Sequence, residues 1–296
     1  MTTIITALFN DILQEACLIK STNQTLEAPW QYPLTTKISS EYGKAAAQSL
    51  LELSHRVAVH NLQINEGNKD PIKLDPPNFD VVIPFDIKYM LQEVNILWFF
   101  YSTSMNIVAL VFTSTYANIL FLVDFSYSQV EPSSIENYGH GMKMHGGFWT
   151  HYLTIREKLL STLNTYVNNE TQILSTGISL GGALSTITTL DLYQRKLSED
   201  VVIKDIVHYS FASPKVFNTI GAEHYNKFSL PSYRVHNGSD IITSTALPLM
   251  PISLRPLVTE DFMHVKNVSY FDRNLGSYYN NHVLAYLNEY DIQPLM

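Results

Sequence analysis

Apolar residues recur with helical spacing in two places near the start of the chain. The first pattern is carried by Ile4, Leu8, Ile12 and Leu13, and the second, stronger one runs from Ala45 to His60. Spacing of this kind indicates one apolar face on a helix, so both segments are predicted to pack on the outside of a sheet. Between Asn61 and Pro84 the composition shifts to Asn, Gly, Asp, Lys and Pro, which predicts a surface loop.

The segment from Ile96 to Val123 contains no charged residue in 28 positions. Its length would allow a transmembrane helix. Its β-branched, aromatic and hydroxyl residues, and the breaks at STSMN and TST, instead favour two buried strands, Ile96 to Tyr101 and Ile107 to Phe112. Continuous apolar character is expected of strands that helices cover on both faces.

Strand and helix patterns alternate in the rest of the chain. A crossover helix is predicted over Phe148 to Val167, and a strand from Gln172 leads to a turn at Ser179 and a helix that ends at Tyr193. Two more strands are predicted, Val201 to Phe211 and Ser232 to His236. This order predicts an α/β fold with a mostly parallel central sheet. We expect one domain over residues 1–296, with helices and loops in 1–95 and the core in 96–296.

Charge and cysteine content narrow the class of protein. The net charge of −8 and the lack of a Lys/Arg cluster argue against a nucleic-acid partner and against electrostatic binding to anionic membranes. Cys17 is the only cysteine, so the chain forms no internal disulfide. The first basic residue is Lys20, which does not fit a signal peptide, so the N-terminal segment is expected to be retained as a helix and a cytoplasmic location is slightly favoured. N-x-S/T sequons begin at Asn23, Asn169, Asn237 and Asn267, and we interpret them as chance matches.

The segment Gly177-Ile178-Ser179-Leu180-Gly181 matches the G-x-S-x-G pattern of a nucleophile elbow. Such an elbow places a serine on a strained turn between a strand and a helix, so small residues such as Gly177 and Gly181 are needed beside it. The N–H of Leu180, at the start of the helix, could then stabilise an oxyanion. An ordinary glycine-rich turn explains the pentapeptide equally well.

A catalytic serine needs a base and a carboxylate that orients the base. In α/β-hydrolases these follow in the order serine, acid, histidine. Asp240 comes just after the predicted strand Ser232 to His236, which leaves His264 and His282 as candidate bases. A structural histidine is the alternative for each. The hydroxyl-rich loop Thr113-Ser114-Thr115 follows a central strand and is a candidate second oxyanion donor, and the apolar segment Tyr116 to Phe125 is a candidate lid.

Five blocks between about residues 96 and 290 resemble the class 3 lipases, α/β-hydrolases that include the triacylglycerol lipases of filamentous fungi. They are IVALVFTST, MKMHGGF, STGISLGGALSTI, FASPKVFN and YRVHNGSDIITSTALP. The chain departs from the family pattern at Ile178, where a histidine is common, at Thr113-Ser114, where Arg-Gly is usual, and at Ala212, which replaces a glycine.

The resemblance implies specific roles. It makes Ser179 the nucleophile, Asp240 the acid and His282 the base, with Thr115 and Leu180 in the oxyanion hole and His264 at a non-catalytic position. The implied function is a serine carboxylic ester hydrolase that acts on acylglycerols or other acyl esters, with no metal or organic cofactor. The apolar lid would contact a lipid surface transiently. A phospholipase A-type acyl hydrolase and a non-catalytic lipid- or partner-binding protein remain alternatives.

Overall fold

The computed structural model describes residues 29–89, 92–114, 128–133, 135, 138–244, 262–277 and 280–295. The predicted helix over Ile4 to Leu13, Cys17, Thr115 and the predicted lid Tyr116 to Phe125 lie outside the described residues. Within them no helix is both long and apolar enough to cross a membrane.

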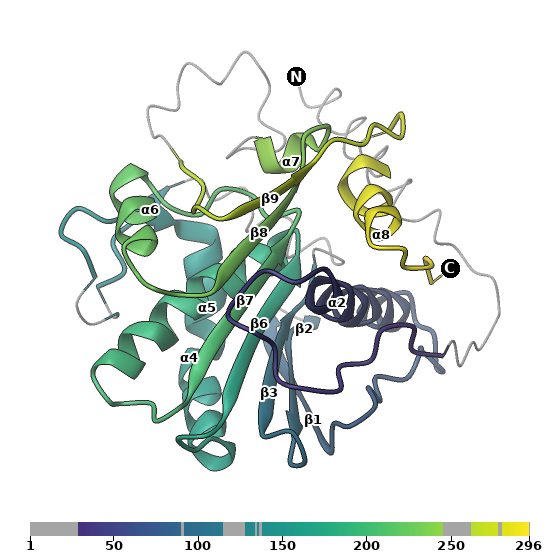
Figure 1. The fold of residues 1–296 in the computed structure, drawn as a ribbon, viewed down its shortest axis with the longest axis horizontal. Coiled ribbons are helices and arrows are strands. Elements are labelled where there is room, and N and C mark those ends of the chain that lie inside the picture. Colours follow the sequence, from purple (N-terminus) through teal and green to yellow (C-terminus); the bar gives the residue numbers. More distant parts are fainter. Residues whose placement is uncertain are drawn as a thin grey trace.

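A seven-stranded sheet forms the centre of the fold (Figure 1). Its strands, in spatial order, are β1 (Val81–Tyr89), β2 (Gln92–Ser102), β3 (Ile107–Phe112), β6 (Gln172–Ile178), β7 (Asp205–Phe211), β8 (Ser232–Asn237) and β9 (Val268–Phe271). The pairs β1–β2 and β2–β3 are antiparallel, and the other four pairs are parallel. A mostly parallel sheet is therefore confirmed.

Helices cover both faces of this sheet. The helical elements are α2 (Lys44–Asn65), α4 (Gly146–Tyr166), α5 (Leu180–Leu197), α6 (Thr219–Asn226), α7 (Ile241–Ser244), a π-helical turn (Asn280–Leu284) and α8 (Ala285–Glu289), and a small separate sheet pairs β4 (Gln129–Val130) with β5 (Met144–His145). Helices α4, α5 and α6 lie on one side of the sheet, and α2 and α8 lie on the other (Figure 1). This is the layered arrangement that the alternating pattern predicts.

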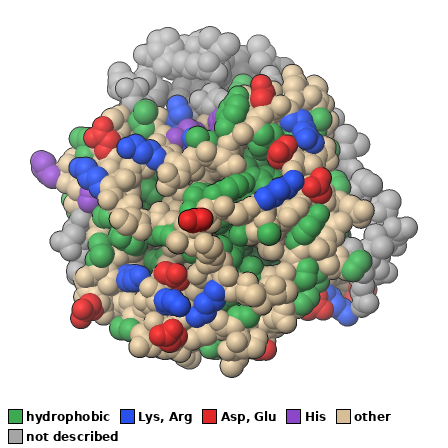
Figure 2. Space-filling view, viewed as in Figure 1, with side chains coloured by type: hydrophobic (Ala, Val, Ile, Leu, Met, Phe, Trp, Pro, Cys, Tyr) green, Lys and Arg blue, Asp and Glu red, His purple; other side chains and the backbone are tan. Residues whose placement is uncertain are grey.

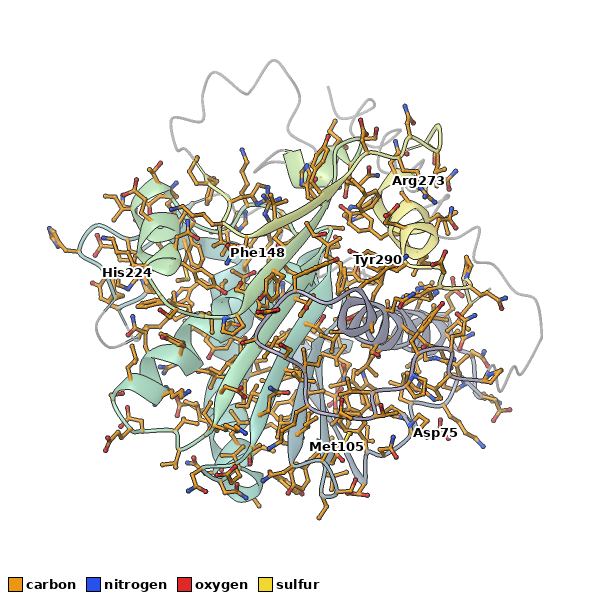
Figure 3. The ribbon with its side chains drawn as sticks, in the orientation of Figure 1. Asp75, Met105, Phe148, His224, Arg273 and Tyr290 are labelled. Carbon is orange, nitrogen blue, oxygen red and sulfur yellow. The ribbon has the colours of Figure 1, made fainter. Side chains whose placement is uncertain are left out.

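Each face of the sheet packs into its own hydrophobic cluster. Phe148 belongs to the cluster on the α4 and α5 side and Tyr290 to the cluster on the α2 side; both are labelled in Figure 3. Strand β3 is completely buried, which explains the uninterrupted apolar run that its sequence shows. The molecular face in Figure 2 carries acidic and basic side chains interspersed around a central hydrophobic area.

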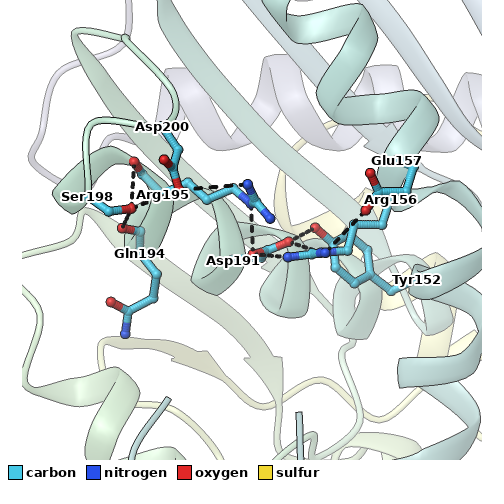
Figure 4. Close-up of polar contacts among 8 residues, drawn as sticks. All are labelled: Tyr152, Arg156, Glu157, Asp191, Gln194, Arg195, Ser198 and Asp200. Carbon is cyan, nitrogen blue, oxygen red and sulfur yellow. Dashed lines mark hydrogen bonds and ion pairs between the residues drawn. The ribbon is translucent and has the colours of Figure 1, made fainter. Parts of the chain in front are cut away.

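A buried ionic network joins α4 to α5 (Figure 4). Asp191 accepts from Tyr152 Oη at 2.6 Å, from Arg156 Nε at 2.6 Å and from Arg195 Nε at 3.3 Å. Asp191 is 1% exposed, so its charge requires these partners. Burial, followed by the charge and hydrogen bond of Asp191, raises the pKa of the Tyr152 hydroxyl well above its usual value, which keeps it a donor.

Two strands of the seven-stranded sheet were not predicted, β1 and β9. The loop prediction for Asn61 to Pro84 is wrong at both ends, because α2 continues to Asn65 and β1 begins at Val81. Pro84 lies inside β1, a position open to proline because β1 is the edge strand of the sheet. Strand β9 was missed because it has four residues and lies at the opposite edge, where alternate side chains are exposed.

Candidate active site

Ser179 occupies the turn between β6 and α5. Its backbone angles are φ 58° and ψ −122°, a conformation that residues other than glycine rarely adopt. Surrounding hydrogen bonds hold it there: its N–H donates to Phe211 O at 2.9 Å, and its carbonyl accepts from Gly182 N at 2.9 Å. The side chain is half-buried. Strain held by neighbouring structure is typical of a turn that presents a nucleophile.

The glycines beside Ser179 let the sheet and α5 approach closely. A Cβ on Gly177 would overlap the backbone of Gly181, and a Cβ on Gly181 would overlap the carbonyl oxygen of Phe112 at the end of β3. Parallel pairing sets Phe112 beside Gly177, so the end of β3 lies next to the turn. Any larger residue would push the start of α5 away from β3.

Asp240 and His282 are brought together from positions 42 residues apart. His282 Nδ1 lies 2.8 Å from Asp240 Oδ2, and the Asp240 side chain is completely buried. Asp240 Oδ1 accepts from Ile242 N at 3.0 Å. Because a carboxylate accepts hydrogen bonds, Nδ1 carries the proton in neutral His282, and Nε2 is the nitrogen that can take a proton.

Tyr286 and Asn237 complete the surroundings of this pair, and neither was predicted from the sequence. Tyr286 Oη donates to Asp240 Oδ2 at 3.0 Å and accepts from Asn237 N at 3.0 Å. Burial, followed by the charge of Asp240, raises the pKa of Tyr286 well above its ordinary value, so the hydroxyl stays protonated. The Asn237 amide donates to Asn281 O at 2.9 Å, which ties β8 to the residue before His282. The spacing of four residues between His282 and Tyr286 was the available signal.

His264 lies apart from the Asp240 carboxylate. Its Nε2 donates to Thr243 O at 2.5 Å, and Thr243 Oγ1 donates to Asp240 O at 2.9 Å. Burial, followed by the charge of Arg234, lowers the pKa of His264 to about 3, so the ring is neutral at ordinary pH. The His264 ring therefore holds the segment after Asp240 through the backbone carbonyl of Thr243.

His208 has the contacts of a structural histidine. Its Nε2 lies 3.0 Å from Ser185 Oγ and its Nδ1 lies 2.8 Å from Ser232 Oγ. The ring is completely buried, which lowers its pKa to about 3. These contacts join α5, β7 and β8 beneath the site and leave the ring no access to a substrate.

The departures from the family pattern have visible structural consequences. Ala212 adopts φ 51°, the left-handed conformation that glycine adopts without strain, which explains why glycine is usual there. Thr113 is buried, and its hydroxyl accepts from Asn61 Nδ2 at 2.8 Å. Among the residues that the structure describes, no three His, Cys, Asp or Glu side chains are grouped to hold a metal ion.

Comparisons with known proteins show which family and which fold the chain resembles. Residues 109–250 match the sequence model of the family described as Lipase (class 3). A lipase of Rhizomucor miehei is 30% identical over 104 residues, which are 34% of this chain and 28% of that protein. The aligned region therefore spans less than a third of that relative.

Solved structures extend the similarity over most of the fold. The Rhizomucor miehei triacylglyceride lipase has a TM-score of 0.53 at 19% identity and covers 74% of this chain and 78% of its own. The mono- and diacylglycerol lipase of Aspergillus oryzae has a TM-score of 0.55 at 16% identity, with 80% and 82% covered. The predicted resemblance is thus confirmed: residues 109–250 match the class 3 lipase family, and the chain has the α/β-hydrolase fold of these lipases.

Proposed function

We propose that this protein is a serine carboxylic ester hydrolase of lipase type. The single observation that carries the proposal is the 2.8 Å hydrogen bond between His282 Nδ1 and Asp240 Oδ2, in a fold that presents Ser179 on a strained turn. In the proposal Ser179 is the nucleophile, His282 the base and Asp240 the acid. The class 3 lipase match supports it, although the matched segment ends before His282.

The proposed reaction has two halves. Ser179 Oγ attacks the ester carbonyl while His282 Nε2 takes the hydroxyl proton, and His282 then gives this proton to the leaving alcohol. Water hydrolyses the acyl-enzyme by the reverse sequence. Asp240 holds the imidazole in the required tautomer and stabilises the imidazolium. The proposed oxyanion donors are Leu180 N–H, at the first turn of α5, and Thr115.

The proposed substrates are acyl esters of lipids. The named relatives are triacylglycerol lipases and a mono- and diacylglycerol lipase, which supports acylglycerols as the first class to test. The apolar segment Tyr116 to Phe125 is the proposed lid, which would contact the lipid surface. This assignment involves neither a metal nor an organic cofactor.

A fluorophosphonate probe tests the proposal directly, because it modifies only a serine that is activated as a nucleophile. We expect stoichiometric labelling at Ser179, no labelling of Ser179→Ala, and loss of labelling in His282→Ala. His264→Ala is the matched histidine variant and should retain labelling. Turnover is then measured on a panel of triacylglycerol, phospholipid and short-chain esters.

Three outcomes would change the assignment. An unlabelled wild-type protein without esterase activity would favour the lipid-binding alternative. Labelling that survives in His282→Ala and is lost in folded His264→Ala would reverse the choice of base. Preferential turnover of phospholipid would redirect the substrate class to a phospholipase A-type activity.

A further inference from the structure

Asn61, near the end of α2, is hydrogen bonded to Thr113. Thr113 is the first residue of the loop Thr113-Ser114-Thr115, the oxyanion loop of the proposed function. Its amide Nδ2 donates to Thr113 Oγ1 at 2.8 Å, and its Oδ1 accepts from Trp98 Nε1 at 3.2 Å. Asn61 is 1% exposed and Thr113 is completely buried. The indole of Trp98 can only donate, so it fixes which end of the Asn61 amide faces Thr113. A flipped amide would set two donors against each other at Trp98.

Thr113 is held from its backbone side as well. Its N–H donates to Ile96 O at 3.1 Å, which extends the β2–β3 ladder by one residue. On the α5 side, a Cβ added to Gly181 would lie 2.8 Å from Thr113 O, so the first turn of α5 packs directly on this carbonyl. Thr113 is therefore fixed between α2, β2 and the helix that begins immediately after Ser179.

We propose that Asn61 is a positioning residue for the oxyanion loop. It acts through the Thr113 hydroxyl and fixes the first residue of the loop, where the chain leaves β3. The inference rests on the proposed function. It accounts for a departure of this chain from the class 3 pattern: where Arg-Gly is usual, a threonine hydroxyl anchored by a buried asparagine fixes the start of the loop.

The position of an oxyanion donor is sensitive to such an anchor. Donors stabilise the transition state only within hydrogen-bond distance of the developing charge, and loss of one donor costs about two to three orders of magnitude in turnover. Asn61 and Trp98 also border a pocket of about 350 Å³. The bond from Trp98 keeps the buried Asn61 amide turned toward Thr113.

The matched variants Thr113→Val and Thr113→Ser isolate the hydroxyl. Valine keeps the shape and removes the acceptor, whereas serine restores it. We expect Thr113→Val to lower kcat about tenfold to hundredfold with KM nearly unchanged, because the anchor acts on the transition state. Thr113→Ser should recover most of the wild-type kcat. Thr189→Val is the control: Thr189 Oγ1 donates to Ser185 O within α5, away from the loop, so its loss should leave kcat unchanged.

A double-mutant cycle tests whether Asn61 works through Thr113. Asn61→Leu alone should lower kcat to a similar extent, and Asn61→Leu with Thr113→Val should be no slower than the worse single variant. If the two losses multiply, Asn61 acts independently of Thr113 and the inference is overturned. If Thr113→Val does not fold, Trp98→Phe decides the matter: it removes the indole donor together with part of the ring and leaves Asn61 and Thr113 in place, and an unchanged kcat would overturn the inference.

The two proposals fail in different ways. A wild-type protein that the fluorophosphonate does not label overturns the proposed function, and the positioning role with it. A wild-type protein that is labelled and active, with Thr113→Val equally active, overturns only the positioning role.

Discussion

His282 and Tyr286 lie four residues apart and both hydrogen bond to the same oxygen, Oδ2 of Asp240, at 2.8 Å from His282 Nδ1 and at 3.0 Å from Tyr286 Oη. The π-helical turn Asn280–Leu284 carries His282, and α8 continues from it to Tyr286. One short helical segment thus supplies two of the contacts that hold the buried carboxylate.

Tyr286→Phe should weaken the site without unfolding the protein. It removes one donor to Asp240 and leaves Asn237 N–H without its acceptor. A hydrogen bond to a charged group contributes about 1.5–3 kcal/mol, and His282 still holds the carboxylate, so we expect kcat to fall about tenfold. Steady-state kinetics on an ester substrate and the rate of fluorophosphonate labelling both measure this loss.

Tyr152→Phe is the matched control for that experiment. Tyr152 also donates to a buried carboxylate, Asp191, at 2.6 Å, but in the network between α4 and α5 (Figure 4). It should lower stability and leave kcat unchanged. Equal effects of the two variants on kcat would show that Tyr286 acts only through general stability.

The central elements could be predicted because their sequence patterns are local. Strand β3 has the predicted bounds, Ile107–Phe112, and β6 leads to Ser179 as expected. Strand β1 could not be predicted in this way, because Pro84 indicates a loop until the position of β1 at the sheet edge is known. An edge position depends on the pairing of the whole sheet, which no single segment encodes.

Contacts at the site between residues far apart in the chain could not be predicted from local sequence patterns, for the same reason. Residue order left His264 and His282 as equal candidates, and the resemblance to class 3 lipases alone favoured His282; in the fold it is His282 that lies at the Asp240 carboxylate. The contact between Asn61 and Thr113 joins residues 52 positions apart, and neither residue type alone indicates a partner. Contacts of this kind depend on how α2 lies on the sheet.

His208 should make stability depend on pH. Its pKa is lowered to about 3 by burial, whereas in the unfolded chain it is about 6.5, so between these values the unfolded state binds more protons. The contribution of His208 to the free energy of unfolding is therefore fully present above about pH 6.5 and is lost as the pH falls toward 3. One such group contributes a slope of up to about 1.4 kcal/mol per pH unit.

The variant His208→Gln measures this contribution. Denaturant unfolding at several pH values between 4 and 7 should give a shallower slope for the variant than for the wild type. Other buried histidines contribute to both proteins and cancel in the difference. His140→Gln makes the same substitution at an exposed histidine and is the matched control. Parallel slopes for wild type and His208→Gln would contradict the prediction.

Gly181→Ala should destabilise the protein by about 1–3 kcal/mol or more, because the new methyl would overlap the carbonyl oxygen of Phe112 and neither backbone can move freely. Thermal unfolding measures the loss. Gly276→Ala is the comparison: its φ of +85° costs the variant about 1–2 kcal/mol, but its Cβ would meet no atom within 4 Å. A smaller loss for Gly181→Ala than for Gly276→Ala would contradict the close approach of α5 to β3.

Ser179→Gly and Ser179→Ala separate the cost of the strained turn from the chemistry of the hydroxyl. Both remove the nucleophile and should abolish labelling. Alanine keeps the strain at φ 58° and ψ −122°, whereas glycine relieves it. Such a conformation costs about 1–3 kcal/mol, and the greater freedom of glycine in the unfolded chain offsets up to about 1 kcal/mol of the relief. We therefore expect Ser179→Gly to be more stable than Ser179→Ala by about 1 kcal/mol in denaturant unfolding. Equal stabilities would limit the strain stored in the turn to about 1 kcal/mol, the amount that the freedom of glycine in the unfolded chain offsets, and the requirement for a nucleophile would then cost the fold little stability.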